Sequence, residues 1–108
     1  MNVAILFGRK NSKNIKNKNI LKIFSKPMFE YPIDAAKKVK EIDRIYVSSD
    51  SQHILTKSKK RGCFPINRPK YLCDDKALLE DAIQHAVNYC QIIHKNKIEN
   101  FIILLCNS

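Results

Sequence analysis

The sequence of 108 residues contains two glycines, no tryptophan and no long apolar run. Its most apolar segment, residues 101–106, has the length of one strand, whereas a membrane-spanning helix needs roughly 20 apolar residues. The first residues also lack the apolar segment and small-residue cleavage site of a secretory signal. We therefore expect a cytoplasmic protein that does not enter a membrane.

The sequence also lacks closely spaced cysteines. The nearest two of its four cysteines are ten positions apart, so neither a zinc site nor a disulfide framework is indicated. We expect reduced, partly buried thiols. Cys106 could be a nucleophile at a strand end, but a packed thiol is the favoured interpretation. The three histidines lack metal-ligand spacing, and His85 is interpreted as a helix residue that is partly buried.

Acidic residues are missing from the first 29 positions, which hold seven lysines and arginines. Over the whole sequence the formal net charge is +10, from 20 basic and 10 acidic residues. This asymmetry indicates an anionic partner: a phosphorylated small molecule, a nucleic acid or an acidic surface. Charge alone is equally compatible with lysines that are simply solvated.

Apolar spacing predicts strands that alternate with helices in one domain, residues 1–108. Strands are expected at residues 2–7, 44–48, 63–66 and 101–106, the last being the best candidate for a central strand. One helix should begin near Tyr31, because Pro32 is tolerated only in the first turn. Further helices are expected at residues 51–61 and 79–93. The residues expected on the buried face of the last helix are Leu79, Ala82, Ala86, Tyr89 and Ile93.

This alternation is typical of an α/β fold: a three-layer sandwich with a mostly parallel sheet. Ligands of such folds bind beyond the carboxyl ends of the strands. The segments that follow the expected strands should therefore share one crevice, which would bring together residues 8–19, Asp50, Arg68 and Asn107. Ser49 and Asp50 also carry side-chain oxygens suited to begin a helix, and for Asp50 this cap is the simpler account.

Residues 8–19 (GRKNSKNIKNKN) combine two ways of binding phosphate. Arginine offers a planar fork and lysine a mobile point charge, while serine and asparagine add neutral hydrogen bonds. The glycines of a Walker loop or of a dinucleotide fingerprint are absent. Taken by itself, the segment predicts an anion site of unspecified kind.

Ordered motifs along the chain resemble the acylneuraminate (sialic-acid-type) cytidylyltransferases, N-terminal half only. Arg9-Lys10-Asn11-Ser12-Lys13, Ile15 and Lys18-Asn19 resemble that family's Arg-x-x-Ser-Lys signature. The further matching blocks, in the family's order, are Lys26-Pro27, Asp34-Ala35-Ala36-Lys37, Val47-Ser48-Ser49-Asp50, Arg68-Pro69 with Leu72, Asp75 and Ala77, and Leu104-Leu105. The resemblance implies a Rossmann-like fold of the nucleotide-diphospho-sugar transferase type.

The resemblance also implies an activity: transfer of CMP from CTP to the anomeric hydroxyl of a sialic-acid-like nonulosonic acid, with release of pyrophosphate. Such enzymes serve lipopolysaccharide or capsule biosynthesis. The implied catalytic residues are Arg9 and Lys18, at the triphosphate, with Ser12 and Asn19 supporting it. Arg68 and the backbone near Ala77 would help to recognise cytosine.

The same resemblance implies partners beyond these residues. Magnesium ligands, much of the sugar pocket and the homodimer element are expected in a second half of the family fold. Asp74 and Asp75 could be a substitute, but adjacent side chains usually diverge and a helix cap is about as good an account, so no complete magnesium site is expected in these residues. Two other functions stay open: a catalytically inactive nucleotide-binding domain, and a basic module that binds nucleic acid. The latter is disfavoured because no aromatic residue interrupts the basic segment.

Overall fold

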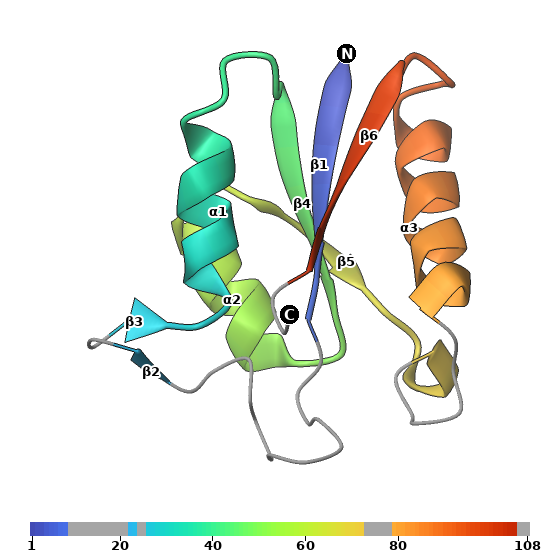
Figure 1. Ribbon diagram of the computed structural model, residues 1–108. Coiled ribbons are helices and arrows are strands. Elements are labelled where there is room, and N and C mark those ends of the chain that lie inside the picture. The colour runs from blue at the N-terminus through green and yellow to red at the C-terminus, as the bar shows by residue number, and fades with distance from the viewer. Residues whose placement is uncertain (9–21, 24–25, 73–78, 106–108) are drawn as a thin grey trace.

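The computed structural model describes residues 1–8, 22–23, 26–72 and 79–105 (Figure 1). Four strands form one sheet in the order β5-β4-β1-β6, and every neighbouring pair is parallel. They are β1 Asn2–Phe7, β4 Arg44–Ser49, β5 Phe64–Asn67 and β6 Asn100–Leu105. The short strands β2 Lys22–Ile23 and β3 Lys26–Pro27 pair with each other in antiparallel fashion.

Helices cover both faces of the sheet, which confirms the expected three-layer α/β sandwich (Figure 1). Helices α1 Glu30–Lys37 and α2 Gln52–Lys60 pack on one face, and α3 Leu79–Ile93 packs on the other. A single 3-10 turn, η2 Lys70–Leu72, follows β5. A parallel sheet needs this cover because its strands are apolar on both sides. None of the described helices is long and apolar enough to cross a membrane.

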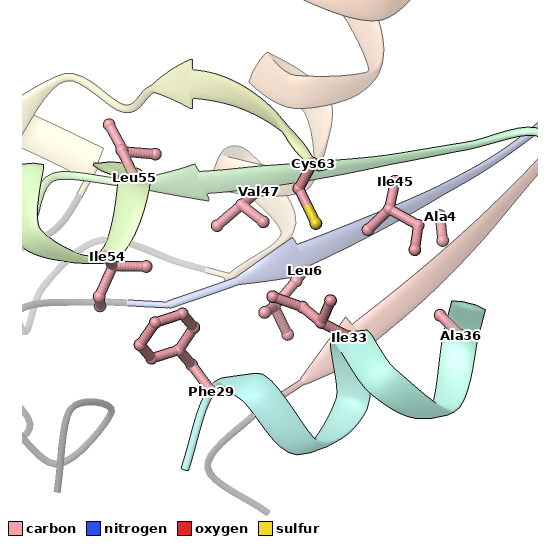
Figure 2. Close-up of a cluster of buried hydrophobic side chains, with 10 residues drawn as sticks. All are labelled: Ala4, Leu6, Phe29, Ile33, Ala36, Ile45, Val47, Ile54, Leu55 and Cys63. Carbon is pink, nitrogen blue, oxygen red and sulfur yellow. The ribbon is translucent and has the colours of Figure 1, made fainter. Parts of the chain in front are cut away.

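The core beneath α1 and α2 is built from alternate residues of the two central strands (Figure 2). Ala4 and Leu6 of β1 point to this face, because successive side chains of a strand point to opposite faces. Phe29 and Ile33 meet them from the start of α1 and are fully buried. The other members of this cluster are Ala36, Ile45, Val47, Ile54, Leu55 and Cys63.

On the opposite face, α3 packs through small side chains. Its buried residues are Ala82, Ala86 and Cys90, spaced four apart, which lie against Val3 and Ile5 of β1. The expectation for this helix was partly wrong, since Leu79, Tyr89 and Ile93 are 48%, 39% and 48% exposed. The small residues allow the helix to approach the sheet closely, and the larger apolar side chains therefore turn outward.

The N-cap of helix α2 is Ser51, and not Ser49 or Asp50, the two residues considered from the sequence. The Oγ of Ser51 accepts a hydrogen bond from the Ile54 amide at 3.3 Å, so Ser51 is the N-cap. Ser49 Oγ in turn accepts from the Ser51 amide at 3.0 Å. The interpretation of Asp50 as the cap is therefore wrong. At the other end, Gly62 has φ +86°, a left-handed conformation that favours glycine after a helix.

An ion-pair cluster joins the end of α2 to the first turns of α1. Arg61 Nη1 lies 2.9 Å from Glu30 Oε1, and its Nη2 donates to Asp34. The hydrogen bond that Arg61 donates to Asp34 is the main reason why the pKa of Arg61 is raised. Asp34 belongs to one of the family-like blocks, and in this structure it helps to hold α1 against the end of α2.

Strand β6 lies at the edge of the sheet in the described part of the chain, where its only strand neighbour is β1. The expectation that residues 101–106 form a central strand is therefore wrong for these residues, and β1 holds the central position together with β4. The inner residues of β6 are half-buried, whereas Val3 to Leu6 of β1 are fully buried.

Candidate functional site

The carboxyl ends of the four strands meet at one edge of the sheet, because all four run in the same direction. Strand order reverses at β1, which has β4 on one side and β6 on the other. The edge beyond such a reversal is where open α/β sheets bind ligands. Gly8 leaves β1 at this point, and residue 9 is the first of the basic segment.

Arg68 lies at this edge, directly after β5, and its side chain is turned into the protein. Only 6% of the residue is exposed. Its Nε donates to Ser48 Oγ at 3.1 Å, and its Nη2 donates to the carbonyl oxygens of Ser48 at 2.8 Å and Gly8 at 3.3 Å. The guanidinium carbon also lies 5.7 Å from the centre of the Phe7 ring. Arg68 thus joins the ends of three strands.

Backbone hydrogen bonds reinforce this junction. The Gly8 amide donates to the Ser48 carbonyl at 3.1 Å, and the Arg68 amide donates to the Ser49 carbonyl at 3.0 Å. The carbonyl oxygens that converge here are the negative ends of peptide dipoles, and the buried guanidinium places a permanent positive charge among them. The edge therefore holds a fixed positive charge, whose field favours anionic groups nearby.

Ser48 is a residue that sequence reasoning missed at this edge. It is fully buried, and both its hydroxyl and its carbonyl oxygen accept from Arg68. The sequence offered one signal, a serine at the end of a strand that is otherwise apolar. A buried hydroxyl in that position needs a partner, but the partner lies 20 positions away in the sequence.

Of the site residues expected from the sequence, Arg68 lies within the described residues. Arg9, Ser12, Lys18, Asn19 and Ala77 lie outside them, as do Cys106 and Asn107. Asp50 follows β4 at the same edge as Arg68 and is half-buried. The structure therefore places Asp50 and Arg68 on the expected side of the sheet, where Arg68 also donates a hydrogen bond to the Gly8 carbonyl.

No three His, Cys, Asp or Glu side chains among the described residues are close enough together to hold a metal ion. Asp74 and Asp75 lie outside those residues. His94 directly follows α3, and its Nε2 lies 2.7 Å from the hydroxyl of Tyr46. Burial raises the pKa of Tyr46. His85 is half-buried in α3, as expected. These groups therefore pack within the fold.

Cys63 and Cys90 are buried free thiols, which agrees with the expectation for these two cysteines. Burial raises the pKa of Cys63, and it raises the pKa of Cys90 to about 11. A thiol of this kind holds its proton at neutral pH and is a poor nucleophile. Neither cysteine therefore fits a catalytic role.

Comparison with known proteins relates this chain to one family. The family model described as "Cytidylyltransferase" matches residues 3–100. A Helicobacter pylori protein, pseudaminic acid cytidylyltransferase and UDP-2,4-diacetamido-2,4,6-trideoxy-beta-L-altropyranose hydrolase, is 45% identical over 76 residues, or 69% of this chain and 15% of that protein. The N-acylneuraminate cytidylyltransferase of Escherichia coli is 33% identical over 86 residues, or 80% of this chain and 20% of that one.

A pseudaminic acid cytidylyltransferase of Campylobacter jejuni is 36% identical over 91 residues, which cover 83% of this chain and 39% of that protein. Among solved structures, CMP:2-keto-3-deoxy-manno-octonic acid synthetase complexed with CTP superposes with a TM-score of 0.75. The match has 20% identity and covers 99% of this chain and 40% of the other, so it supports the fold. This chain thus spans 15% to 39% of the length of these three curated relatives. Because the family model covers residues 3–100, the chain belongs to the cytidylyltransferase family.

Proposed function

We propose that this chain forms the CTP-binding part of a CMP-sugar synthetase. The hydroxyl oxygen on the anomeric carbon of a nonulosonic acid attacks the α-phosphorus of CTP. The new bond joins that oxygen to phosphorus, while the bond from phosphorus to the bridging oxygen of the β-phosphate breaks. Pyrophosphate departs with the electron pair, and the hydroxyl proton passes to a base.

The observation that carries the proposal is the junction around Arg68. A buried guanidinium sits where the strand order reverses, and it donates to the carbonyl of Gly8, the residue before the basic segment. Family membership makes a cytidine nucleotide the best ligand for that edge. A sheet edge with a fixed cation and a basic segment suits a triphosphate better than a neutral ligand.

In this proposal, Arg9 and Lys18 bind the triphosphate and act as the catalytic residues. Negative charge builds up on the leaving pyrophosphate, and cations placed in advance stabilise it most in the transition state. Ser12 and Asn19 add hydrogen bonds to the phosphates. Arg68 and the backbone at Ala77 help to recognise cytosine.

The names of the relatives suggest two sugars, pseudaminic acid and N-acylneuraminic acid. We propose a cytoplasmic enzyme that takes CTP and one of these acidic sugars. Magnesium is part of the proposal as the family cofactor, but the described residues do not form a fitting carboxylate set. No step is therefore assigned to it here, and its ligands, like any homodimer contacts, are proposed to lie beyond these residues.

Thermal-shift measurements with CTP, UTP, ATP and GTP, each with magnesium, test the nucleotide assignment. We expect CTP to raise the melting temperature of the 108-residue chain, because a ligand that binds only the folded state stabilises it. The other three nucleotides should have a smaller effect. The absence of a shift with every nucleotide would contradict the proposal.

Calorimetry of two lysine variants tests the basic segment. Lys18→Ala should weaken CTP binding by about tenfold or more, which corresponds to the loss of one charge-assisted hydrogen bond. Lys37→Ala is the matched control, because Lys37 is exposed in the last turn of α1. Equal CTP affinities of the two variants would exclude Lys18 from the site.

A second function is a catalytically inactive nucleotide-binding domain, which would bind CTP in the same way. An assay of pyrophosphate release with CTP and each sugar separates the two functions. Binding of CTP without release of pyrophosphate would support the inactive domain. Tight, salt-sensitive binding of RNA or DNA without a CTP effect would instead indicate a nucleic-acid module.

A further inference from the structure

Ser48 is the side chain that fixes the orientation of Arg68. The Arg68 guanidinium donates to both oxygen atoms of Ser48, to its hydroxyl through Nε and to its carbonyl oxygen through Nη2. Two bonds to one residue define the plane of the guanidinium as well as its position. The Phe7 ring, 5.7 Å from the guanidinium carbon, packs against it from β1.

Because both residues are buried, water cannot easily replace the hydrogen bonds between Ser48 and Arg68. Ser48 is fully buried and Arg68 is 6% exposed, so bulk water has little access to replace a lost bond. A buried charged donor without an acceptor is costly, and the guanidinium would turn toward other acceptors if the hydroxyl were removed.

We infer that Ser48 is a positioning residue for base selection: it holds Arg68 in the orientation in which Arg68 helps to distinguish cytosine from other bases. The inference rests on the proposed function, in which Arg68 contacts the base. Ser48 itself acts through Arg68 and not on the nucleotide. Three hydrogen bonds from the guanidinium to Ser48 and Gly8 hold Arg68 in this orientation.

The ratio of CTP to UTP affinity distinguishes this role of Ser48 from a purely structural one. Cytosine and uracil differ at position 4 and N3, while CTP and UTP carry the same triphosphate. A misplaced Arg68 should therefore change the ratio of CTP to UTP affinity. A general loss of packing should weaken both nucleotides by the same factor and leave the ratio unchanged.

The test is calorimetric titration of the 108-residue chain and its variants with CTP and with UTP. Ser48→Ala removes the hydroxyl acceptor, and we expect the preference for CTP to fall about tenfold, as expected from a lost hydrogen bond to a charged group. Ser48→Cys keeps nearly the same volume but offers a weak sulfur acceptor, so its preference should fall as well. This second variant keeps the test decisive where the alanine variant does not fold.

Ser58→Ala is the matched control, a buried serine in α2 whose hydroxyl has no hydrogen-bond partner among the described residues. It should keep the wild-type preference. A wild-type chain that does not prefer CTP over UTP would overturn the proposed role of Arg68. Wild-type preference that is retained in both Ser48 variants would overturn the inference about Ser48 alone.

Discussion

Single residues in this fold owe their chemistry to burial. Cys90 is fully buried against β1, and its thiol pKa is about 11 compared with an ordinary value of 9.0. Arg68 is buried too, and hydroxyl and carbonyl oxygens accept hydrogen bonds from its guanidinium. The difference lies in the partners: a neutral thiol tolerates an apolar site, whereas a guanidinium requires acceptors.

The raised pKa of Cys90 predicts a loss of stability at high pH. Below about pH 9 the thiol is protonated in both the folded and the unfolded chain. Between about pH 9 and 11 the unfolded chain releases this proton while the folded chain retains it, so the free energy of unfolding decreases. Melting temperatures from pH 8 to 10.5 should therefore fall more steeply for the wild type than for Cys90→Ala. Parallel curves would show that Cys90 does not titrate in this range.

The stability of helix α2 depends on its N-cap residue, Ser51. Ser51 is 4% exposed, and its hydroxyl satisfies the Ile54 amide, one of the donors that a helix start leaves unpaired. Ser51→Ala should lower the free energy of unfolding by about 1 kcal/mol, which is typical for the loss of a serine cap. Urea denaturation followed by circular dichroism measures this change.

The control for this helix is Thr56→Ala, an exposed position within α2. Alanine has a higher helix propensity than threonine, so this variant should be neutral or slightly more stable. A loss in Thr56→Ala as large as that in Ser51→Ala would show that the effect is not due to the cap.

Most elements could be predicted from the sequence because their apolar periods are clear. The predicted ranges 2–7 and 79–93 coincide with β1 and α3. The buried face of α3 could not be chosen in this way, because two overlapping apolar stripes pass through Ala82 and Ala86. In the folded chain the stripe with Cys90 is the one that packs against the sheet, and this choice depends on the sheet residues that face it.

The site was predictable only in part, because some of its contacts join residues that are far apart in the sequence. The order of elements placed Arg68 and Asp50 at the correct edge, because parallel strands end together. The partners of Arg68 could not be read from local patterns. Ser48 is 20 and Gly8 is 60 positions away along the sequence, and only the assembled sheet brings them together.

The position of β6 at the edge of the sheet also depends on how the whole sheet is assembled. Residues 100–105 are strongly apolar, but the crossover through α3 places β6 beside β1 and outside the β1–β4 pair. Among the described residues, its other edge has no neighbouring strand. An unpaired edge with apolar side chains is prone to pair with another chain.

We therefore predict that the 108-residue chain self-associates through β6 at high concentration. Leu105 is 43% exposed at the end of β6, and Leu105→Lys should shift the chain toward monomer, because a charge on an edge strand opposes pairing. Sedimentation velocity over a range of concentrations measures this shift. Ile92→Lys is the control, since Ile92 is 78% exposed on α3 and lies outside β6. Equal dissociation in both variants would indicate general apolar contacts, and a wild-type chain that stays monomeric would show that the edge is already protected.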